Sequence, residues 1–502
     1  MTTLAHPRSS SSARQGRFPA IWMTTALAVL AAGLVLFSQT RAFAWDEGFH
    51  ILTAQLILHG KRPYLDFVFS QTPLNAYWNA GWMALFGENW RVAHGAAALC
   101  SAAAMLLTAR YVVLRFPVAG WRIPAATAAA CLVGLDLMVV KFGTIAQAYG
   151  LCLLAVTAAY WFSILAVERR NARAAALAGL CCGIAAASSL LTLPAGPVML
   201  VWLFVYGRGG RWRKCAAFLA GETAAFAPVF WLFAQGPRRV WFGIVNYNLL
   251  YRQVDWPGAT QHNLEVITSW IDSGPALLLI LLSAAGLLFV RFRSAWDQRV
   301  KNEFYLCAWL SAVLALYISS VRPTFPRYYM FAVPFLSILA VAGIYFFASR
   351  VYRLDRPWHA VAVLGLLLLL GLGKGIYDAR DNLTWPEMEQ VARKVNAVAM
   401  PGQALYADEL TYFLTRHAPP SGMEMANSHK FHFTPERMRG LHLISDTELE
   451  RQVETGVYGV LETCEDDDYI AEHGYAKWFR KSAEAGSCTV FWDWQPSGEP
   501  KR

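Results

Sequence analysis

Three carboxylates follow the first apolar run of the chain. Two belong to the sequence Trp45-Asp46-Glu47-Gly48, and Asp66 lies further along the same semi-polar stretch. Carboxylates beside a bilayer are costly unless they are solvated or paired, so they are candidates for function. A carboxylate at this boundary can act as a general base toward a hydroxyl or an amine. The alternative is that these acids only set the ends of interfacial helices, but the basic loop described next favours a site that acts on a lipid head group.

A pair of arginines lies much later in the chain, in the stretch 321–329. Arg322 and Arg327 belong to this stretch, and Tyr328 follows directly. The planar guanidinium group suits phosphate oxygens, so we predict that these three residues hold a lipid phosphate near the carboxylates. Anchoring of the loop among lipid head groups by Arg and Tyr is the alternative.

Three further polar residues lie in and after an intervening short turn, at Lys141, Gln147 and Tyr149. Lys141 adds a third cation, although snorkelling of its ammonium group to the head groups explains it equally well. Gln147 and Tyr149 carry groups that form hydrogen bonds, and we predict that they contact a sugar.

The composition indicates what kind of protein must position these residues. Of 502 residues, 56% are hydrophobic and only 16% are charged, and the mean hydropathy is +0.33. These values are typical of a polytopic membrane protein. The net charge of +10 comes from short basic clusters between apolar runs, which is the pattern of cytoplasmic loops. A nucleic-acid partner is therefore not expected.

Eleven apolar runs are candidates for membrane spans. They cover approximately 20–38, 92–114, 123–140, 148–167, 174–189, 192–206, 215–234, 274–292, 304–320, 329–349 and 357–373. If all eleven cross the membrane, the basic clusters share the side of the N-terminus, as the excess of Lys and Arg in cytoplasmic loops requires. Pro194 and Pro197 interrupt the region 174–206, where we predict a hairpin of two short or tilted helices.

This count divides the chain into three parts. Residues 1–19 form a cytoplasmic tail, residues 20–373 a transmembrane domain with the outer loop 41–91, and residues 374–502 an extracytoplasmic domain. In the last part, sequence patterns predict helices at 386–398 and 446–453, and strands at 403–408, 457–461 and 489–494. We therefore predict an all-α polytopic membrane protein of about eleven transmembrane helices with a small C-terminal α/β domain.

Two of the nine cysteines stand apart from the rest. Seven fall inside apolar runs, where cysteine packs as a small hydrophobe. Cys464 and Cys488 instead lie in the polar C-terminal part. Outside the cytoplasm they can be oxidised, and the sequence leaves a disulfide and two free thiols as equal alternatives.

The first outer loop also resembles a known family. The resemblance rests on Trp45-Asp46-Glu47-Gly48, Gly60, Pro63-Tyr64, Asp66-Phe67 and Pro73-Leu74. These residues are similar to the first outer loop of GT-C membrane glycosyltransferases of the protein mannosyltransferase and aminoarabinose transferase type, glycosyltransferase family 39. The resemblance implies that Asp46 is the catalytic base or positions the acceptor, and that Glu47 is its partner carboxylate.

The resemblance further implies the reaction and its place. Such enzymes take a sugar from a polyprenyl-phosphate donor and transfer it on the outer face of the membrane by direct displacement, with inversion. The acceptor is a glycan, a lipid or a protein, and a bacterial inner membrane is the expected location. The relatives often carry a second acid near the start of the fourth span, where this chain has Gln147. We therefore assign no metal ligands, and a divalent metal stays an alternative.

Two other functions remain as alternatives. A transporter or flippase for a lipid-linked or polar solute also uses carboxylates and arginines in the membrane, but paired Gly/Pro-broken helices in corresponding halves are missing from the sequence. A non-catalytic relative that binds lipid is the second. No Gly-rich phosphate loop, HExxH or GxSxG occurs, so nucleotide hydrolysis and zinc or serine chemistry have no anchor.

Overall fold

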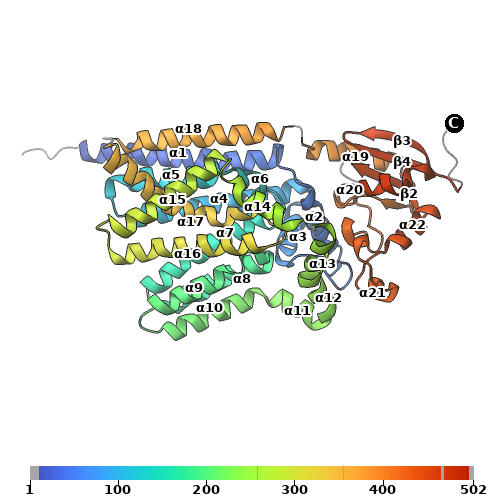
Figure 1. The fold of residues 1–502 in the computed structure, drawn as a ribbon, viewed down its shortest axis with the longest axis horizontal. Helices are drawn as coiled ribbons and strands as arrows, with labels where there is room; N and C mark the ends of the chain where they lie inside the picture. Colours follow the sequence, from blue (N-terminus) through green and yellow to red (C-terminus); the bar gives the residue numbers. More distant parts are fainter. Residues whose placement is uncertain (1–10, 257, 354–355, 381, 465–467, 497–502) are drawn as a thin grey trace, which may run out of the picture.

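The protein consists of a helical bundle with a small α/β domain at one end (Figure 1). The structure is a computed structural model and describes residues 11–256, 258–353, 356–380, 382–464 and 468–496. The bundle contains α1 (Ser11–Thr40), α4 (Trp90–Arg115), α5 (Arg122–Gly134), α6 (Leu137–Phe142), α7 (Tyr149–Glu168), α8 (Ala172–Ser188), α9 (Ala195–Tyr206), α10 (Arg211–Ala225), α11 (Ala227–Gln235), α15 (Gly274–Phe292), α16 (Gln298–Ser320), α17 (Val333–Phe346) and α18 (Pro357–Asp378).

Shorter elements come from the outer loops, and several of them lie between the bundle and the α/β domain (Figure 1). From the first outer loop come η1 (Trp45–Glu47), α2 (Gly48–Leu58) and α3 (Leu74–Phe86). Later loops add α12 (Pro237–Trp241), η4 (Phe242–Asn246), α13 (Tyr247–Asp255), α14 (Ala259–Ser269) and η5 (Pro326–Ala332). Single turns η2 (Ala119–Trp121), η3 (Leu190–Thr192) and η6 (Phe347–Val351) complete the bundle.

Seven helical segments of the described chain are long and apolar enough to cross a membrane. They are Ala20–Thr40, Trp90–Arg115, Tyr149–Glu168, Gly274–Phe292, Gln298–Ser320, Pro326–Val351 and Pro357–Asp378. The pair α10 and α11 forms an eighth if it counts as one span bent by 53°. The chain is therefore a multi-pass membrane protein, as the apolar runs predicted.

The remaining predicted spans fall on shorter helices. The region 174–206 forms two helices, α8 and α9, separated by η3, as expected from its prolines. The run 123–140 divides into α5 and α6 because Asp136 caps α6, where its side chain accepts hydrogen bonds of 3.0 Å from the backbone N–H groups of Met138 and Val139. All eleven predicted runs are thus helical, but not all form one full-length helix.

Glycines let neighbouring helices approach until their backbones touch. In α8, a Cβ on Gly179 would come within 1.8 Å of the Phe218 carbonyl oxygen of α10. In α15, a Cβ on Gly286 would come within 2.0 Å of the Leu339 carbonyl oxygen of α17. Small residues at such contacts are typical of membrane helices, whose association depends on close packing. They make the bundle a rigid support for the outer loops.

The C-terminal part forms the predicted small α/β domain. Its helical elements are α19 (Trp385–Val398), α20 (Glu409–Thr415), η7 (Ala426–Lys430), α21 (Pro435–Gly440), α22 (Asp446–Glu454), α23 (Asp468–Glu472) and η8 (Tyr475–Trp478). Strands β1 (Ala404–Tyr406), β2 (Tyr458–Cys464), β3 (Phe479–Ala485) and β4 (Cys488–Trp494) form one sheet in the order β1-β2-β4-β3. Only β1 and β2 run parallel. The sequence patterns predicted every strand except β3.

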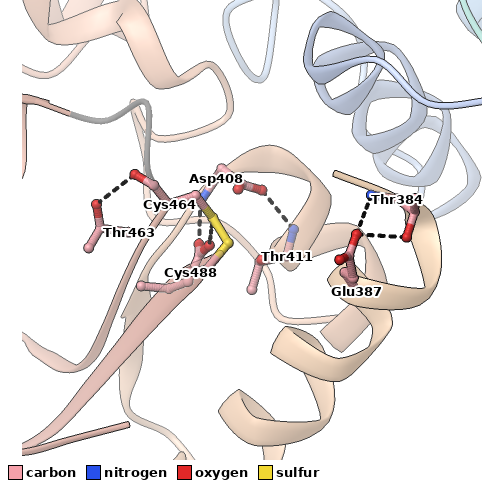
Figure 2. Close-up of a disulfide and its surroundings, with 8 residues drawn as sticks. Thr384, Glu387, Asp408, Thr411, Thr463, Cys464 and Cys488 are labelled. Carbon is pink, nitrogen blue, oxygen red and sulfur yellow. Dashed lines mark hydrogen bonds between the residues drawn. A yellow bond between two sulfur atoms is a disulfide. The ribbon is translucent and has the colours of Figure 1, made fainter. Parts of the chain in front are cut away.

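A disulfide joins two strands of this sheet. Cys464 at the end of β2 and Cys488 at the start of β4 are register partners, and their sulfurs are bonded (Figure 2). In the same view, Glu387 accepts hydrogen bonds from the backbone N–H and the hydroxyl of Thr384, at 2.7 and 2.8 Å, and so caps the start of α19. Of the two alternatives that the sequence left open, the structure contains the disulfide.

Removal of the disulfide should destabilise the α/β domain. The cysteines are 24 residues apart, so the loop-closure model assigns the crosslink about 3.5 kcal/mol of stability. We expect Cys464→Ser/Cys488→Ser to lower the unfolding temperature of the domain in the full-length protein. Dithiothreitol should lower it in the wild type and leave the double variant unchanged. Equal unfolding temperatures with and without reductant in the wild type would contradict the crosslink.

Candidate active site

An ion pair joins two of the predicted site residues, Asp46 in η1 and Arg327 in η5. Asp46 Oδ2 accepts a hydrogen bond from Arg327 Nη2, and Arg327 Nε donates to the Tyr149 hydroxyl at 3.2 Å. The side chain of Asp46 is 54% exposed, whereas that of Arg327 is only 19% exposed. The carboxylate therefore remains accessible to a second molecule while the guanidinium is held from behind.

Aromatic rings surround the Arg327 guanidinium. Its Cζ lies 4.4 Å from the ring centroid of Phe325 and 5.5 Å from that of Phe142. The ring of Tyr328 lies 6.3 Å from that of Tyr149. Cations over aromatic faces are stabilised without any need for a carboxylate, so the rings hold the charge of Arg327 in place while leaving its donors for an anion.

Glu47 points away from Asp46 and into the protein. It is wholly buried, its Oε1 is hydrogen-bonded to His94 Nε2, and the same oxygen accepts the backbone N–H of Ala146 at 2.9 Å. The Ala146 carbonyl in turn accepts from the side-chain amides of Asn75 and Asn79, at 3.0 and 2.6 Å. The two adjacent acids thus have different environments, one open and paired with arginine, the other enclosed.

Gln147 follows Ala146 directly and is also buried, at 3% exposure. Its Nε2 has no hydrogen-bond partner among the described residues. An amide donor buried without a partner is costly, which is consistent with a group that meets a ligand. The segment 146–149 therefore brings together the backbone that holds Glu47, the amide of Gln147 and the hydroxyl that holds Arg327.

A second arginine, Arg252 of α13, lies near Tyr328 of this cluster. It interacts electrostatically with the hydroxyls of Tyr328 and Tyr317, and burial lowers its pKa. The sequence alone does not single out Arg252, because a basic residue in an aromatic outer loop is more typical of membrane anchoring than of binding. Its proximity to Tyr328 depends on folding of a loop that lies about 75 residues upstream of that tyrosine.

Arg322 does not join the cluster. Its side chain is exposed and forms no ion pair with any residue that the structure describes. The loop that carries it is fixed to α14, where Asn263 donates to the Val321 carbonyl at 2.7 Å and accepts the Thr324 N–H at 2.8 Å. The two arginines predicted as a pair thus have different roles in the loop.

Asp66 also lies apart from Asp46. Its carboxylate accepts hydrogen bonds from Arg62 Nε and Nη2, at 3.0 and 2.9 Å, and these bonds lower the pKa of Asp66. The neighbouring Leu65 carbonyl accepts from Arg239 of α12 at 2.9 Å and is hydrogen-bonded to His442 Nε2 at 2.8 Å. Asp66 therefore shapes the first outer loop where it meets the α/β domain.

Lys141 lies near the same phenyl ring as Arg327, that of Phe142. Its Nζ is 5.9 Å from the centroid of this ring, which also contacts Arg327. Lys141 lines a pocket with Arg41 and Arg380 between the ends of α1, α6 and α18. Apolar side chains complete the lining, at Phe37, Phe43, Ile376 and Leu383. Such a combination suits the head group and first carbons of an anionic lipid.

Among the described residues, one cluster brings three potential metal-ligand atoms within 4.8 Å of one another. It consists of Glu462, Cys464 and Cys488. Both sulfurs belong to the disulfide, and a bonded sulfur is not the thiolate that metals require. The group therefore does not fit a metal while the disulfide is intact.

The α/β domain packs directly against the turn that carries Asp46. A Cβ on Gly48 would lie 3.1 Å from Glu409 Cβ and 3.2 Å from Leu410 Cγ, both in α20. Trp90 at the start of α4 stacks on Trp385 of α19, with ring centroids 4.8 Å apart. Glycine in the motif thus permits close contact between the two domains beside the ion pair.

Comparisons with known proteins agree with the predicted family resemblance. Residues 70–233 match the family model of dolichyl-phosphate-mannose-protein mannosyltransferase. The search of curated proteins found no match. The solved structures described next match most of the chain at low sequence identity.

ArnT from Cupriavidus metallidurans bound to undecaprenyl phosphate has a TM-score of 0.65 and 15% identity, over 94% of this chain and 97% of that chain. Its apo state has a TM-score of 0.68 at the same identity, over 94% and 98%. Archaeal oligosaccharyltransferase AglB from Archaeoglobus fulgidus, in complex with an inhibitory peptide and a dolichol-phosphate, has a TM-score of 0.51 and 12% identity, over 96% and 75%. These likenesses show that the chain has a GT-C-like fold, as predicted.

Enlarging Gly48 should weaken the contact between the two domains. Its backbone is helical, so Gly48→Val brings little backbone strain, but the new methyl groups meet α20. Overpacking of this kind costs about 1–3 kcal/mol. We expect faster tryptic cleavage after Arg380, between α18 and α19, in the full-length variant.

The matched control is Gly81→Val in α3. It introduces the same side chain into a helix of the same loop, but a Cβ there meets nothing within 4 Å. Cleavage of Gly48→Val at the rate of Gly81→Val would show that the contact with α20 does not hold the domain.

Proposed function

We propose that this protein is a glycosyltransferase that moves a sugar from a polyprenyl-phosphate donor to an acceptor at the outer face of the membrane. The observation that carries the proposal is the ion pair of Asp46 and Arg327 at the bundle end, with the carboxylate exposed and the guanidinium enclosed. The match to a mannosyltransferase family model supports the reaction class. Structural neighbours solved with undecaprenyl phosphate and with a dolichol-phosphate support the donor class.

The reaction needs a base on one side of the anomeric carbon and cations on the other. We assign the first role to Asp46 and the second to Arg327, assisted by Arg252 and Tyr328. The donor phosphate competes with Asp46 for the guanidinium donors of Arg327. Binding of the donor thereby releases the carboxylate from its ion pair at the moment when a base is needed.

The chemical step is a single displacement. The acceptor oxygen or nitrogen forms a bond to the anomeric carbon, and its proton passes to the Asp46 carboxylate. The bond between the anomeric carbon and the phosphate oxygen breaks, and its electron pair leaves with the polyprenyl phosphate. Attack opposite the leaving group inverts the configuration. Arg327 and Arg252 stabilise the charge that grows on the departing phosphate.

Other residues of the prediction take supporting roles in this scheme. Tyr149, whose hydroxyl accepts from Arg327, is assigned to hold that guanidinium, and the buried amide of Gln147 is assigned to the sugar. Lys141, in its pocket with Arg41 and Arg380, is assigned to the lipid phosphate as it approaches from the bilayer. Arg322 is assigned to a peripheral contact, and Asp66 to the shape of the loop.

The proposed orientation follows from the distribution of basic clusters. The N-terminus lies in the cytoplasm, and the α/β domain lies outside with the ion pair. A bacterial inner membrane is the proposed location, supported by the likeness to ArnT. The proposed acceptor is a glycan, a lipid or a protein.

Replacement of Asp46 by asparagine should slow sugar transfer strongly while donor binding persists. The amide cannot take the acceptor proton, so we expect kcat to fall about 10²- to 10⁴-fold. The measurement is sugar transfer from a defined polyprenyl-phosphate sugar, with donor binding followed in parallel. Asp66→Asn is the matched control, because it removes a carboxylate of the same loop that is bound to Arg62. Normal transfer by folded Asp46→Asn would refute the base assignment.

Replacement of Arg327 by lysine tests the cation. Lysine keeps the charge but loses the fork that contacts Tyr149 and Asp46 together. We expect kcat/KM to fall about 10²-fold, because a donor that meets the developing charge is lost. Arg322→Lys should lower it less than about tenfold, since its side chain is exposed. A larger loss for Arg322→Lys than for Arg327→Lys would reverse the assignment.

A further inference from the structure

We propose that His94 is a positioning residue, which shares one proton with Glu47 and so places Asp46 in the right position beside Arg327. The inference rests on the proposed function, because its purpose is to orient the base. His94 lies in α4 and belongs to none of the motifs in the first outer loop. Its side chain and that of Glu47 are both wholly buried.

The hydrogen-bond partners of His94 determine where its protons lie. Nδ1 is 2.7 Å from the backbone carbonyl oxygen of Ser38 at the end of α1. A carbonyl oxygen only accepts, so Nδ1 carries a hydrogen and donates it. The other ring nitrogen, Nε2, is hydrogen-bonded to Glu47 Oε1. A bare Nε2 facing an ionised carboxylate would place two lone pairs against each other, so this arrangement requires a proton between them.

The shared proton makes the pair electrically neutral. If it resides on Nε2, an imidazolium faces a carboxylate; if it resides on Glu47, a carboxylic acid donates to a neutral imidazole. In both forms the net charge of the pair is zero. Glu47 therefore adds no net negative charge beside Asp46, although the two acids are adjacent in sequence. Asp46 carries the single net negative charge of the turn and faces Arg327 with it.

The His94–Glu47 pair also connects the segment that carries Asp46 with the segment that holds Arg327. Glu47 Oε1 accepts the N–H of Ala146, and three residues later Tyr149 holds Arg327. His94 Nδ1 ties the same pair to the end of α1 through Ser38. Displacement of Glu47 would therefore move η1, with Asp46, relative to Arg327. The rings of Trp90 and Trp385, centred 4.9 and 5.7 Å from that of His94, enclose the pair and exclude water.

Two substitutions of His94 separate its two hydrogen bonds. The amide of asparagine reaches the place of Nδ1, so His94→Asn can keep the bond to Ser38 but loses the one to Glu47. The amide of glutamine reaches the place of Nε2, so His94→Gln can donate to Glu47 but loses the bond to Ser38. A residue that only fills space would respond alike to both changes.

The experiment measures kcat and KM for sugar transfer by His94→Asn, His94→Gln, Glu47→Gln and the double variant Glu47→Gln/His94→Asn, in the full-length protein. We expect kcat of His94→Asn to fall at least tenfold with KM for the lipid donor within twofold of the wild type, since misplacement of a reacting group affects the chemical step. His94→Gln and Glu47→Gln should lose less. Addition of Glu47→Gln to His94→Asn should recover most of the loss, because a neutral amide at position 47 needs no shared proton.

Three results would overturn the proposal. They are a wild-type kcat in His94→Asn, a double variant no more active than His94→Asn, and equal losses in His94→Asn and His94→Gln. If His94→Asn does not fold, a folded double variant supports the proposed proton sharing between His94 and Glu47. A double variant that also fails to fold overturns it. A wild-type protein that transfers no sugar from any polyprenyl-phosphate donor instead refutes the proposed function itself. Wild-type transfer with an unaffected His94→Asn refutes only the positioning role.

Discussion

The ion pair between Asp46 and Arg327 is the interaction on which the proposed site depends. Opposite charges at the edge of a bilayer neutralise one another where either alone would be costly. The pair links the first outer loop to the start of a helix more than 280 residues later, so it exists only when the bundle is assembled. Rings and hydroxyls hold the guanidinium, whereas the carboxylate stays half exposed. This asymmetry separates a fixed cation from a carboxylate that a second molecule can reach.

The surrounding structure fixes the positions of Asp46 and Arg327 relative to each other. Close contacts at Gly179 and Gly286 make the bundle stiff, and Asn75 and Asn79 fix the Ala146 peptide from the side of the outer loop. The α/β domain adds a second layer, because α20 packs on Gly48 and Trp385 stacks on Trp90. The turn that carries Asp46 thus lies where the α/β domain packs on the helical bundle.

The helices and strands that depend on local sequence patterns could be predicted, whereas those without such a pattern could not. Apolar runs and capping residues act locally, so the eleven helical runs and all five elements that were predicted for the small domain could be located from the sequence. Strand β3 was missed because its exposed, charged face lacks alternation of apolar and polar residues. The division of the run 123–140 at Asp136 was also missed, because a polar cap within an apolar stretch resembles a polar residue in a continuous helix.

What the sequence by itself determined was the class of protein, the eleven helical runs and the residue types of the site, because apolar periodicity, charge clusters and a short motif are local properties of the chain. What only the tertiary structure decided was which of those residues meet. Asp46, Tyr149 and Arg327 came together, whereas Asp66 paired with Arg62 and Arg322 remained apart. The partner of Glu47 proved to be His94, a residue with no sequence signal of its own. Such pairings depend on how helices distant in sequence pack, and no local pattern records that.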